Sequence, residues 1–494
     1  GEKFGVWPGT HQWVYKEQWL EKFFGEIRRN KEQIITITFN DYLKRFPALG
    51  PIYLPTASYS EMMEWALPPQ RSKQLSELTH DESLSPYRSF LRGGFWRVFL
   101  ARYRESRNMY TKMLYLSDRL QRLPGSERKE ILDALWAGQC NCGYWHGVFG
   151  GLYLNHLRTA VYGNLLRAEV ALDSVEHGNS DPWLKIEEKD FFRDGGQCLL
   201  VSASRFNFYF DLSRGGCLFE WDDKLKSFNF LNTMSRYEEA YHEKLLQAEK
   251  PEQNSENATK TIHEIIRSKE PGLASRLTHD WYRRSSLIDH FLPLTETLEN
   301  FSRAKYEELG DFVLGTYQSE QTVREENKCA EIRLWREGHL WLDQSPVNLK
   351  VEKSILLDSM KTSFPIHYSV YNLSDCPVDV NFGIEFGFAL QAGDTPDRYY
   401  ILPDRTDRPR LGTTGSEDYC REIALVEEWL GIKILLRFSR PITVWRFPVE
   451  TINNSEGGFE RVYQSSVVVA LQRLNLEPFN SQVFDLVLEI ENLK

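Results

Sequence analysis

Three things are scarce in this sequence: cysteine, long apolar runs and an excess of positive charge. Seven cysteines in 494 residues make a sparse, odd-numbered set, which excludes a disulfide scaffold and predicts reduced thiols in the cytoplasm. The longest apolar stretches, such as residues 423–426 and 466–471, have the size of strands and fall short of the roughly 18–20 residues of a membrane helix. Sixty basic against 70 acidic residues give a net charge of −10, which argues against nucleic acid and anionic lipid as partners.

The chain is long and apolar enough to bury sizeable cores. It is 41% hydrophobic, which excludes disorder as its main state, and its length allows roughly three domains or two large ones. Ser58 and Glu61 have the spacing of a capping box, and another helix is expected to begin at Ser126. Two further sets of apolar residues recur at helical spacing: Met109, Met113, Leu116, Leu120 and Leu123, then Leu152, Leu157, Val161, Leu165, Ala168 and Leu172. These segments predict a helical bundle.

A polar turn cluster, HGNSDP at residues 177–182, is the best candidate for a domain boundary. Beyond it, short runs rich in β-branched and aromatic residues recur to the end of the chain, with a polar, helical interlude near 234–269. Such spacing favours a large antiparallel β-sandwich. We therefore expect an α+β protein with helices in residues 1–178 and a sandwich in residues 182–494.

The densest group of chemically versatile side chains lies in residues 136–152, WAGQCNCGYWHGVFGGL. Asn141 and His146 offer hydrogen-bonding groups, while Tyr144 and Trp145 offer flat apolar faces with a polar edge. This pairing suits a sugar ring, and the five glycines of the stretch favour a loop shaped around a ligand. The alternative is a buried helix start with packed aromatic rings. Residues 1–10, with Glu2 and Trp7 among glycines and a proline, form a weaker second candidate.

Metal and nucleotide sites have less support. Cys140, Cys142, His146 and His156 could bind zinc, but Cys-x-Cys is not a usual zinc spacing. Asp394 and Asp397 could bind calcium, although a turn between strands explains them better. The sequence contains no phosphate-binding loop of the Gly-x-x-x-x-Gly-Lys-Ser/Thr type. We expect no metal and no cofactor.

Several longer motifs resemble one enzyme family. Residues 139–154, QCNCGYWHGVFGGLYL, resemble the last signature motif of glycoside hydrolase family 57, and residues 1–7, GEKFGVW, resemble the end of its fourth motif. Residues 53–59 (YLPTASY), 280–290 (DWYRRSSLIDH) and 392–398 (AGDTPDR) are also similar to that family. Within it, the similarity is greatest to the 4-α-glucanotransferase and α-amylase type.

This resemblance implies the end of an incomplete (β/α) barrel with a helical bundle, followed by a galactose mutarotase-like supersandwich. It also implies a retaining mechanism on α-1,4-glucan or maltooligosaccharide, with two carboxylates as nucleophile and acid/base. The resemblance places both carboxylates before Gly1, so we expect the chain to be an inactive fragment. The resemblance is also compatible with a homodimer.

Carried onto this sequence, the resemblance assigns substrate-binding roles to Glu2, Trp7, Asn141, Cys142, Trp145 and His146. Trp145 is expected to stack on a sugar and His146 to bond its hydroxyls. A related glucanotransferase motif has Asp where this chain has Cys142, and a thiol cannot accept hydroxyl hydrogen bonds as a carboxylate does. The choice between amylase and transferase therefore stays open. The competing hypothesis is a non-catalytic carbohydrate-binding or scaffold protein.

Overall fold

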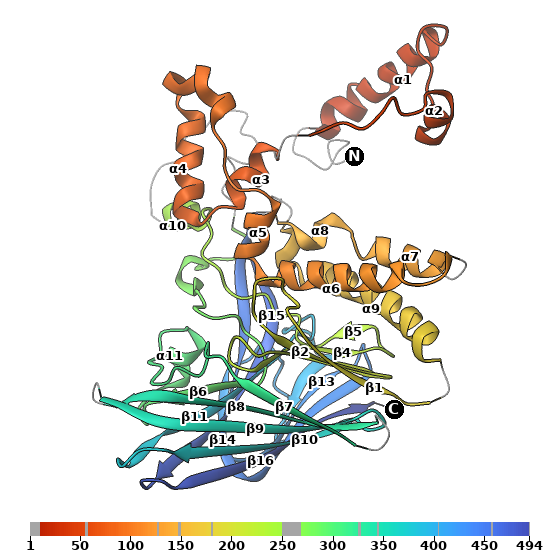
Figure 1. Cartoon of the computed structure of the whole chain (residues 1–494). Coiled ribbons are helices and arrows are strands. Elements are labelled where there is room, and N and C mark those ends of the chain that lie inside the picture. The colour runs from red at the N-terminus through yellow and green to blue at the C-terminus, as the bar shows by residue number, and fades with distance from the viewer. Residues whose placement is uncertain are drawn as a thin grey trace.

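The computed structural model describes residues 10–54, 58–125, 128–146, 150–178, 181–248, 268–324, 328–342, 345–403, 405–455 and 458–493. Most helices precede the strands along the chain, and Figure 1 shows them gathered above the sheets. The predicted α+β class is confirmed. None of the helices in the described part combines the length and the apolar character that a membrane span requires.

Most residues of the two predicted apolar stripes lie in the two longest helices described, α6 (Arg104–Gln121) and α9 (Asn155–His177), while Leu123 and Leu152 fall just outside them. Their inward residues, such as Met109 and Leu165, are fully buried. Gly178 ends α9 with a positive φ of 75°, a conformation that favours glycine at this position. α7 (Arg128–Ala137) packs along α9, and α5 (Trp96–Arg102) leads into α6. Ser126, where α7 was expected to begin, lies outside the described residues.

The predicted capping box is wrong. α3 (Ser60–Trp65) has Tyr59 at its cap position and no side-chain cap, and α4 (Pro69–His80) follows with Pro69 in its first turn. Tyr59 packs edge-on against Trp145 with ring centroids 6.2 Å apart. Tyr59 therefore joins the start of α3 to a distant part of the sequence, a contact that the local pattern does not reveal.

The first described segment stands apart from the bundle. Figure 1 shows α1 (Trp19–Arg29) and α2 (Phe39–Arg45) away from the other helices. Many of its large apolar side chains are exposed, among them Phe24, Ile35, Phe39, Leu49 and Tyr53. No strand occurs among the described residues before Leu184, so the expected barrel remnant is not shown in this part of the chain.

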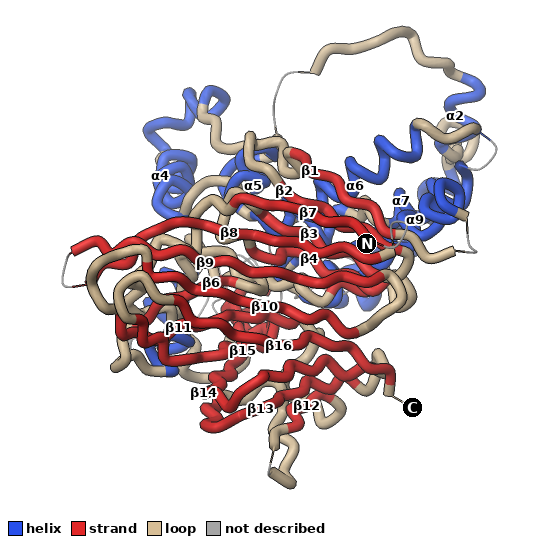
Figure 2. The backbone as a smooth tube through the Cα atoms, turned by 60° about the horizontal axis from the view of Figure 1, so that its bottom comes forward, coloured by secondary structure: helices blue, strands red, loops and turns tan. Residues whose placement is uncertain are grey.

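Two antiparallel sheets follow the helices (Figure 2). The smaller sheet has the order β1-β2-β3-β4-β5: β1 (Leu184–Lys189), β2 (Cys198–Ala203), β3 (Phe206–Asp211), β4 (Cys217–Asp223) and β5 (Phe228–Asn229). The larger sheet has the order β6-β11-β15-β14-β16-β10-β9-β8-β7, with β13 pairing to β14 and β12 to β13. Its strands are β6 (Ile288–Leu292), β7 (Gln318–Arg324), β8 (Cys329–Leu342), β9 (Ser345–Asp358), β10 (Ser363–Asn372), β11 (Val378–Phe388), β12 (Arg398–Ile401), β13 (Gly415–Glu427), β14 (Ile432–Ser455), β15 (Gly458–Leu476) and β16 (Ser481–Asn492).

The main hydrophobic core lies between the two sheets. Phe208 and Trp221 of the smaller sheet contact Phe364 of the larger one, with ring centroids 4.8 and 6.1 Å apart. Such edge-to-face contacts add specificity to the burial of apolar surface. The predicted large antiparallel sheets are therefore present, while the galactose mutarotase-like supersandwich stays a prediction.

The change from helix to strand falls between His177 and Leu184, near the expected boundary. The expected helical interlude contains α10 (His242–Ala248), and residues 249–267 lie outside the described part. Another short helix, α11 (Leu298–Ser302), follows β6. The division into two independent domains stays a prediction.

A buried ionic cluster joins the bundle to the smaller sheet. The Lys112 ammonium in α6 lies 2.9 Å from Glu169 of α9, 2.7 Å from Glu220 and 2.9 Å from Asp222, both in β4. All four side chains are fully buried. Removing one member of such a cluster leaves uncompensated charge in a medium of low dielectric constant, so the cluster fixes how the bundle sits on the sheet.

A second buried cluster involves the DWYRRSSLIDH motif. His290 Nδ1 lies 2.7 Å from Glu308, and its Nε2 lies 3.2 Å from Glu385. Arg284 bridges Glu385, at 2.8 Å, and Asp280, at 3.0 Å. Although burial opposes the cation, the hydrogen bonds from Glu308 and Glu385 raise the pKa of His290 to about 9. The motif therefore supplies charges to the interior of the β region.

Strands β14 and β15 form a long hairpin that leaves the large sheet and reaches the helices (Figure 1). The carbonyl of Ile452 accepts a hydrogen bond from His242 of α10 at 2.8 Å. On the other strand, the Gln464 amide donates to the carbonyl of Tyr153 at 2.8 Å. The hairpin thus connects the sandwich core to the region described next.

Candidate functional site

The glycines of the 136–152 stretch serve close packing. A Cβ on Gly143, in α8 (Asn141–Tyr144), would lie 2.6 Å from Cγ2 of Val161 in α9. Gly151 has a positive φ of 44°, and a Cβ there would lie 2.0 Å from the carbonyl oxygen of Trp145. Both glycines therefore let the loop fold tightly on itself and on α9. The sequence had suggested a different role for them, a loop shaped around a ligand.

The predicted site residues fall into three groups. Trp145 and His146 are buried, with 7% and 2% of their surface exposed. Asn141 and Cys142 are exposed. Glu2 and Trp7 lie outside the described residues. A direct sugar contact by any of the six stays a prediction.

Trp145 and His146 are packed among aromatic rings. The Trp145 ring lies 4.7 Å from that of Phe99, and the His146 ring lies 5.2 Å from that of Trp65 and 5.2 Å from that of Tyr153. In the described part of the chain, both side chains therefore sit beneath a surface formed by other residues.

His146 begins a hydrogen-bonded chain that ends on a carboxylate. Its Nε2 lies 2.7 Å from the Tyr103 hydroxyl, which donates to Oε1 of Glu239 at 2.7 Å. Because Tyr103 uses its proton on Glu239, its oxygen accepts from Nε2, which assigns the imidazole proton to that nitrogen. Burial lowers the pKa of His146 to about 4 despite the nearby Glu239 charge. His146 is therefore a neutral donor near pH 7.

Glu239 is the centre of this network. Its Oε1 also accepts a hydrogen bond from Tyr153, and its Oε2 pairs with Arg102 at 2.8 Å. Burial opposes ionisation, but Arg102 and the hydrogen bonds outweigh it and lower the pKa of Glu239. The carboxylate is thus charged and fully engaged, which suits a positioning role better than proton transfer.

Arg102 extends the network to the rim of a cleft. It donates to the backbone carbonyls of Trp65, at 3.2 Å, and Glu238, at 2.7 Å. The cleft has a volume of about 830 Å³ and lies between α3, α4 and α10. Trp65 and Tyr241 give it an aromatic side, with ring centroids 5.8 Å apart. Its polar lining includes Glu61, Glu64, Ser72, Lys73, Glu77, Glu239 and Glu243.

Glu239, Arg102 and Trp65 were not predicted as site residues from the sequence. Glu239 lies 136 residues from Tyr103 and 86 from Tyr153, within the polar interlude, and no spacing rule connects them. Trp65 stands beside the YLPTASY motif, which gave a signal for the family but none for the cleft.

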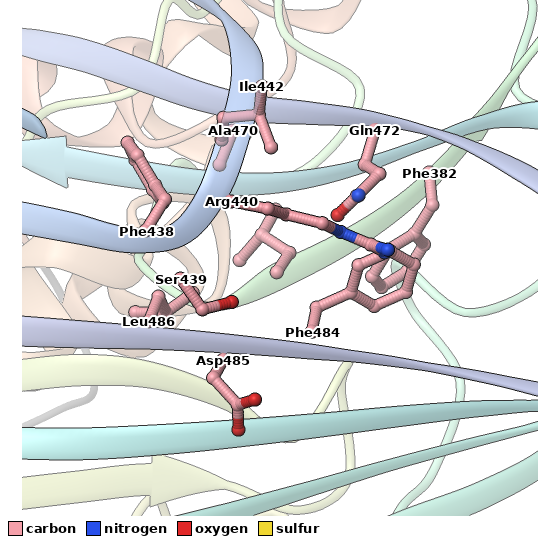
Figure 3. Close-up of a pocket in the computed structure, with 11 residues that line it drawn as sticks. Phe382, Phe438, Ser439, Arg440, Ile442, Ala470, Gln472, Phe484, Asp485 and Leu486 are labelled. Atoms are coloured by element: carbon pink, nitrogen blue, oxygen red, sulfur yellow. The ribbon is translucent and has the colours of Figure 1, made fainter. Parts of the chain in front are cut away.

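The described part of the structure gives no support to a metal site or to a sugar site on the large sheet. A search of the described residues for clusters of three or more metal-ligating side chains finds none. The hollow in Figure 3, on the large sheet, has a volume of only about 20 Å³ and is lined mainly by apolar groups such as Phe382 and Phe484. Arg440 covers the Phe484 ring at 4.8 Å, so little room is left there for a sugar.

The chain is similar to known proteins over nearly all of its length. Residues 190–479 match the family described as alpha-amylase/4-alpha-glucanotransferase, C-terminal, and residues 94–172 match its middle domain. Alpha-amylase 1 of Dictyoglomus thermophilum is 36% identical over 489 residues, and the 4-alpha-glucanotransferase of Thermococcus litoralis is 36% identical over 470 residues.

These matches cover 96% and 94% of this chain but only 66% and 64% of the two relatives. The crystal structure of the 4-alpha-glucanotransferase from Thermococcus litoralis superimposes with a TM-score of 0.75 and 30% identity, covering 100% of this chain and 66% of that one. The chain therefore belongs to the alpha-amylase/4-alpha-glucanotransferase family, glycoside hydrolase family 57, and corresponds to its C-terminal part.

Proposed function

We propose that this chain works as part of a retaining enzyme that cleaves or transfers α-1,4-glucan, and that it positions the substrate. The family membership and the names of the relatives support the reaction. The observation that carries the positioning role is the buried chain from His146 through Tyr103 to Glu239, which ends at the wall of the cleft.

The lining of the cleft suits a glucan. A pyranose ring has an apolar face, which can pack on Trp65 and Tyr241, and a rim of hydroxyl groups that can bond the polar lining. A volume of about 830 Å³ falls within the range of ligand pockets. Asn141 and Cys142, the exposed members of the motif, are proposed to contact glucan. His146 supports Trp65 and Tyr103 from beneath, and Trp145 in turn packs on His146.

The chain alone is proposed to be inactive. A retaining glycosidase needs two carboxyl groups about 5–5.5 Å apart with distinct roles. In the described part, Glu239 is the carboxylate joined to the signature motif, and it is held by Arg102 and two tyrosines. The proposed reaction therefore requires carboxylates beyond this network, on a barrel of which residues 1–178 would form the end.

Titration calorimetry of the purified 494-residue chain with maltoheptaose tests this function. We expect weak binding that Trp65→Leu reduces at least fivefold, while Trp341→Leu, an exposed position on β8, leaves it unchanged. We expect no chain-length redistribution and no glucose release. Equal maltoheptaose binding by the wild type and Trp65→Leu would refute the cleft as the glucan site. Measurable disproportionation would refute the proposal that the chain alone is inactive.

Two accompanying proposals are a cytoplasmic location and a homodimer. Light scattering during size-exclusion chromatography separates monomer from dimer directly. An assay that compares glucose release with chain-length redistribution in the whole enzyme decides between amylase and transferase.

A further inference from the structure

A small cavity lies where the bundle meets the β region, apart from the cleft. Its walls come from the start of α6, the turn between β3 and β4, and the segment that leads into β6. Its volume is about 30 Å³, which is room for about two water-sized particles. Arg104, Arg214 and Arg283 line it, together with Asp211 and Ser285.

The positive charges around this cavity are poorly compensated. One carboxylate oxygen of Asp194 serves three guanidinium groups, at 3.7 Å from Arg104, 3.3 Å from Arg107 and 3.7 Å from Arg214. These distances exceed the roughly 2.7–2.9 Å of a good charge-assisted hydrogen bond. Asp211 is turned to Ser213, accepting from its backbone N–H at 3.1 Å and its hydroxyl at 2.6 Å.

Arg283 adds a fourth guanidinium group, and in the described part of the chain it has neither a hydrogen bond nor an ion pair. Its buried Nε lacks an acceptor, and its one ring contact is with Phe219 at 5.8 Å. Nη1 of Arg214 is likewise buried without a hydrogen-bond acceptor. Buried donors are nearly always satisfied in proteins, so unpaired ones call for a partner.

The pKa of Arg104 is consistent with an excess of positive charge at the cavity. Burial lowers the pKa of Arg104, and the adjacent charge of Arg283 lowers it further. Burial raises the pKa of Asp211, while Ser213, Arg104 and Arg283 favour its charged form. An added anion would favour the charged form of Arg104 and offset the repulsion from Arg283.

We propose that this cavity binds a halide ion, chloride in the cell, between the guanidinium groups of Arg104, Arg214 and Arg283. The volume fits one monatomic anion with a water molecule and is too small for a sugar phosphate. Because the walls belong to both parts of the chain, the bound ion fastens α6 to the β region. The site is independent of the proposed glucan cleft.

The test compares sodium chloride with sodium gluconate at equal ionic strength. In wild-type protein we expect chloride to raise the melting temperature by roughly 1–3 °C, as binding to the folded state requires, and to broaden the ³⁵Cl resonance. Arg283→Gln should lose both effects. It should be at least as stable as the wild type in gluconate, since it removes an unpaired charge.

Arg303→Gln, an exposed position, is the matched control and should keep both effects. A bromide-soaked crystal should show anomalous density between the three arginines. Equal chloride effects in wild type and Arg283→Gln, or a response to phosphate without one to chloride, would overturn the proposal. The proposal would also be overturned if Arg283→Gln were less stable than the wild type in gluconate. That result would mean that Arg283 already has a stabilising partner within the protein.

Discussion

Raising the pH should weaken the β region through one buried imidazole, His290. Its pKa is about 9 in the folded chain against an ordinary value of 6.5, because Glu308 and Glu385 hold the cation. A folded-state pKa above the unfolded one stabilises the protein fully below pH 6.5, and this stabilisation is lost as the pH rises through 9. The difference corresponds to roughly 3 kcal/mol.

The measurement is urea unfolding of wild type and His290→Gln between about pH 6 and pH 9.5. The variant should be less stable at the acid end, and the gap should shrink by roughly 3 kcal/mol toward the alkaline end. Comparing the two proteins at each pH cancels the titration of lysines and tyrosines elsewhere.

A gap that stays constant across this range would falsify the reasoning, since it would mean that His290 is neutral in the folded chain. The groups that face it would then share their protons differently. Burial raises the pKa of Glu308, so that carboxyl would be the first candidate to carry the proton instead.

Three further substitutions test buried contacts of the helical bundle. Lys112→Met removes the ammonium group that Glu169, Glu220 and Asp222 share, although Arg119 stays 3.9 Å from Glu169. It should cost about 3–5 kcal/mol in urea unfolding, and a loss below about 1 kcal/mol would contradict the ionic cluster. Gly143→Ala pushes a methyl group into α9 and should cost about 1–3 kcal/mol, whereas Gly25→Ala, with open space around it, should be neutral or stabilising by calorimetry. Tyr103→Phe breaks the link from the imidazole to Glu239 and should cost about 1–3 kcal/mol; unchanged stability and unchanged glucan binding would show that the link does not matter.

The elements of the fold that are stabilised by local patterns could be predicted. The stripes around Met109 and Leu165 gave the two long helices, because a single apolar face repeats along each. Alternating and β-branched runs gave the antiparallel strands. The start of α3 could not be predicted to the residue, because the capping-box spacing of Ser58 and Glu61 does not decide at which residue the helix begins.

The candidate site divides in the same way. The signature motif drew attention to Trp145 and His146, but not to their burial. Tyr153, whose ring packs on His146, belongs to the same motif, but α5 and Glu239 lie at separations that no sequence rule covers. The glycines misled for a related reason: the sequence shows where a side chain is missing, but only the structure shows what fills the space.

The β14–β15 hairpin has a practical consequence for engineering. Its far end holds α10 through Ile452 and the loop before α9 through Gln464, and the Glu239 backbone N–H in turn donates to His242 at 3.2 Å. Cutting away the β-sandwich to obtain a shorter protein would therefore remove contacts that hold Glu239, the carboxylate bonded to the signature loop. The sandwich acts as the frame that holds this region in place, and it cannot be exchanged like an attached module.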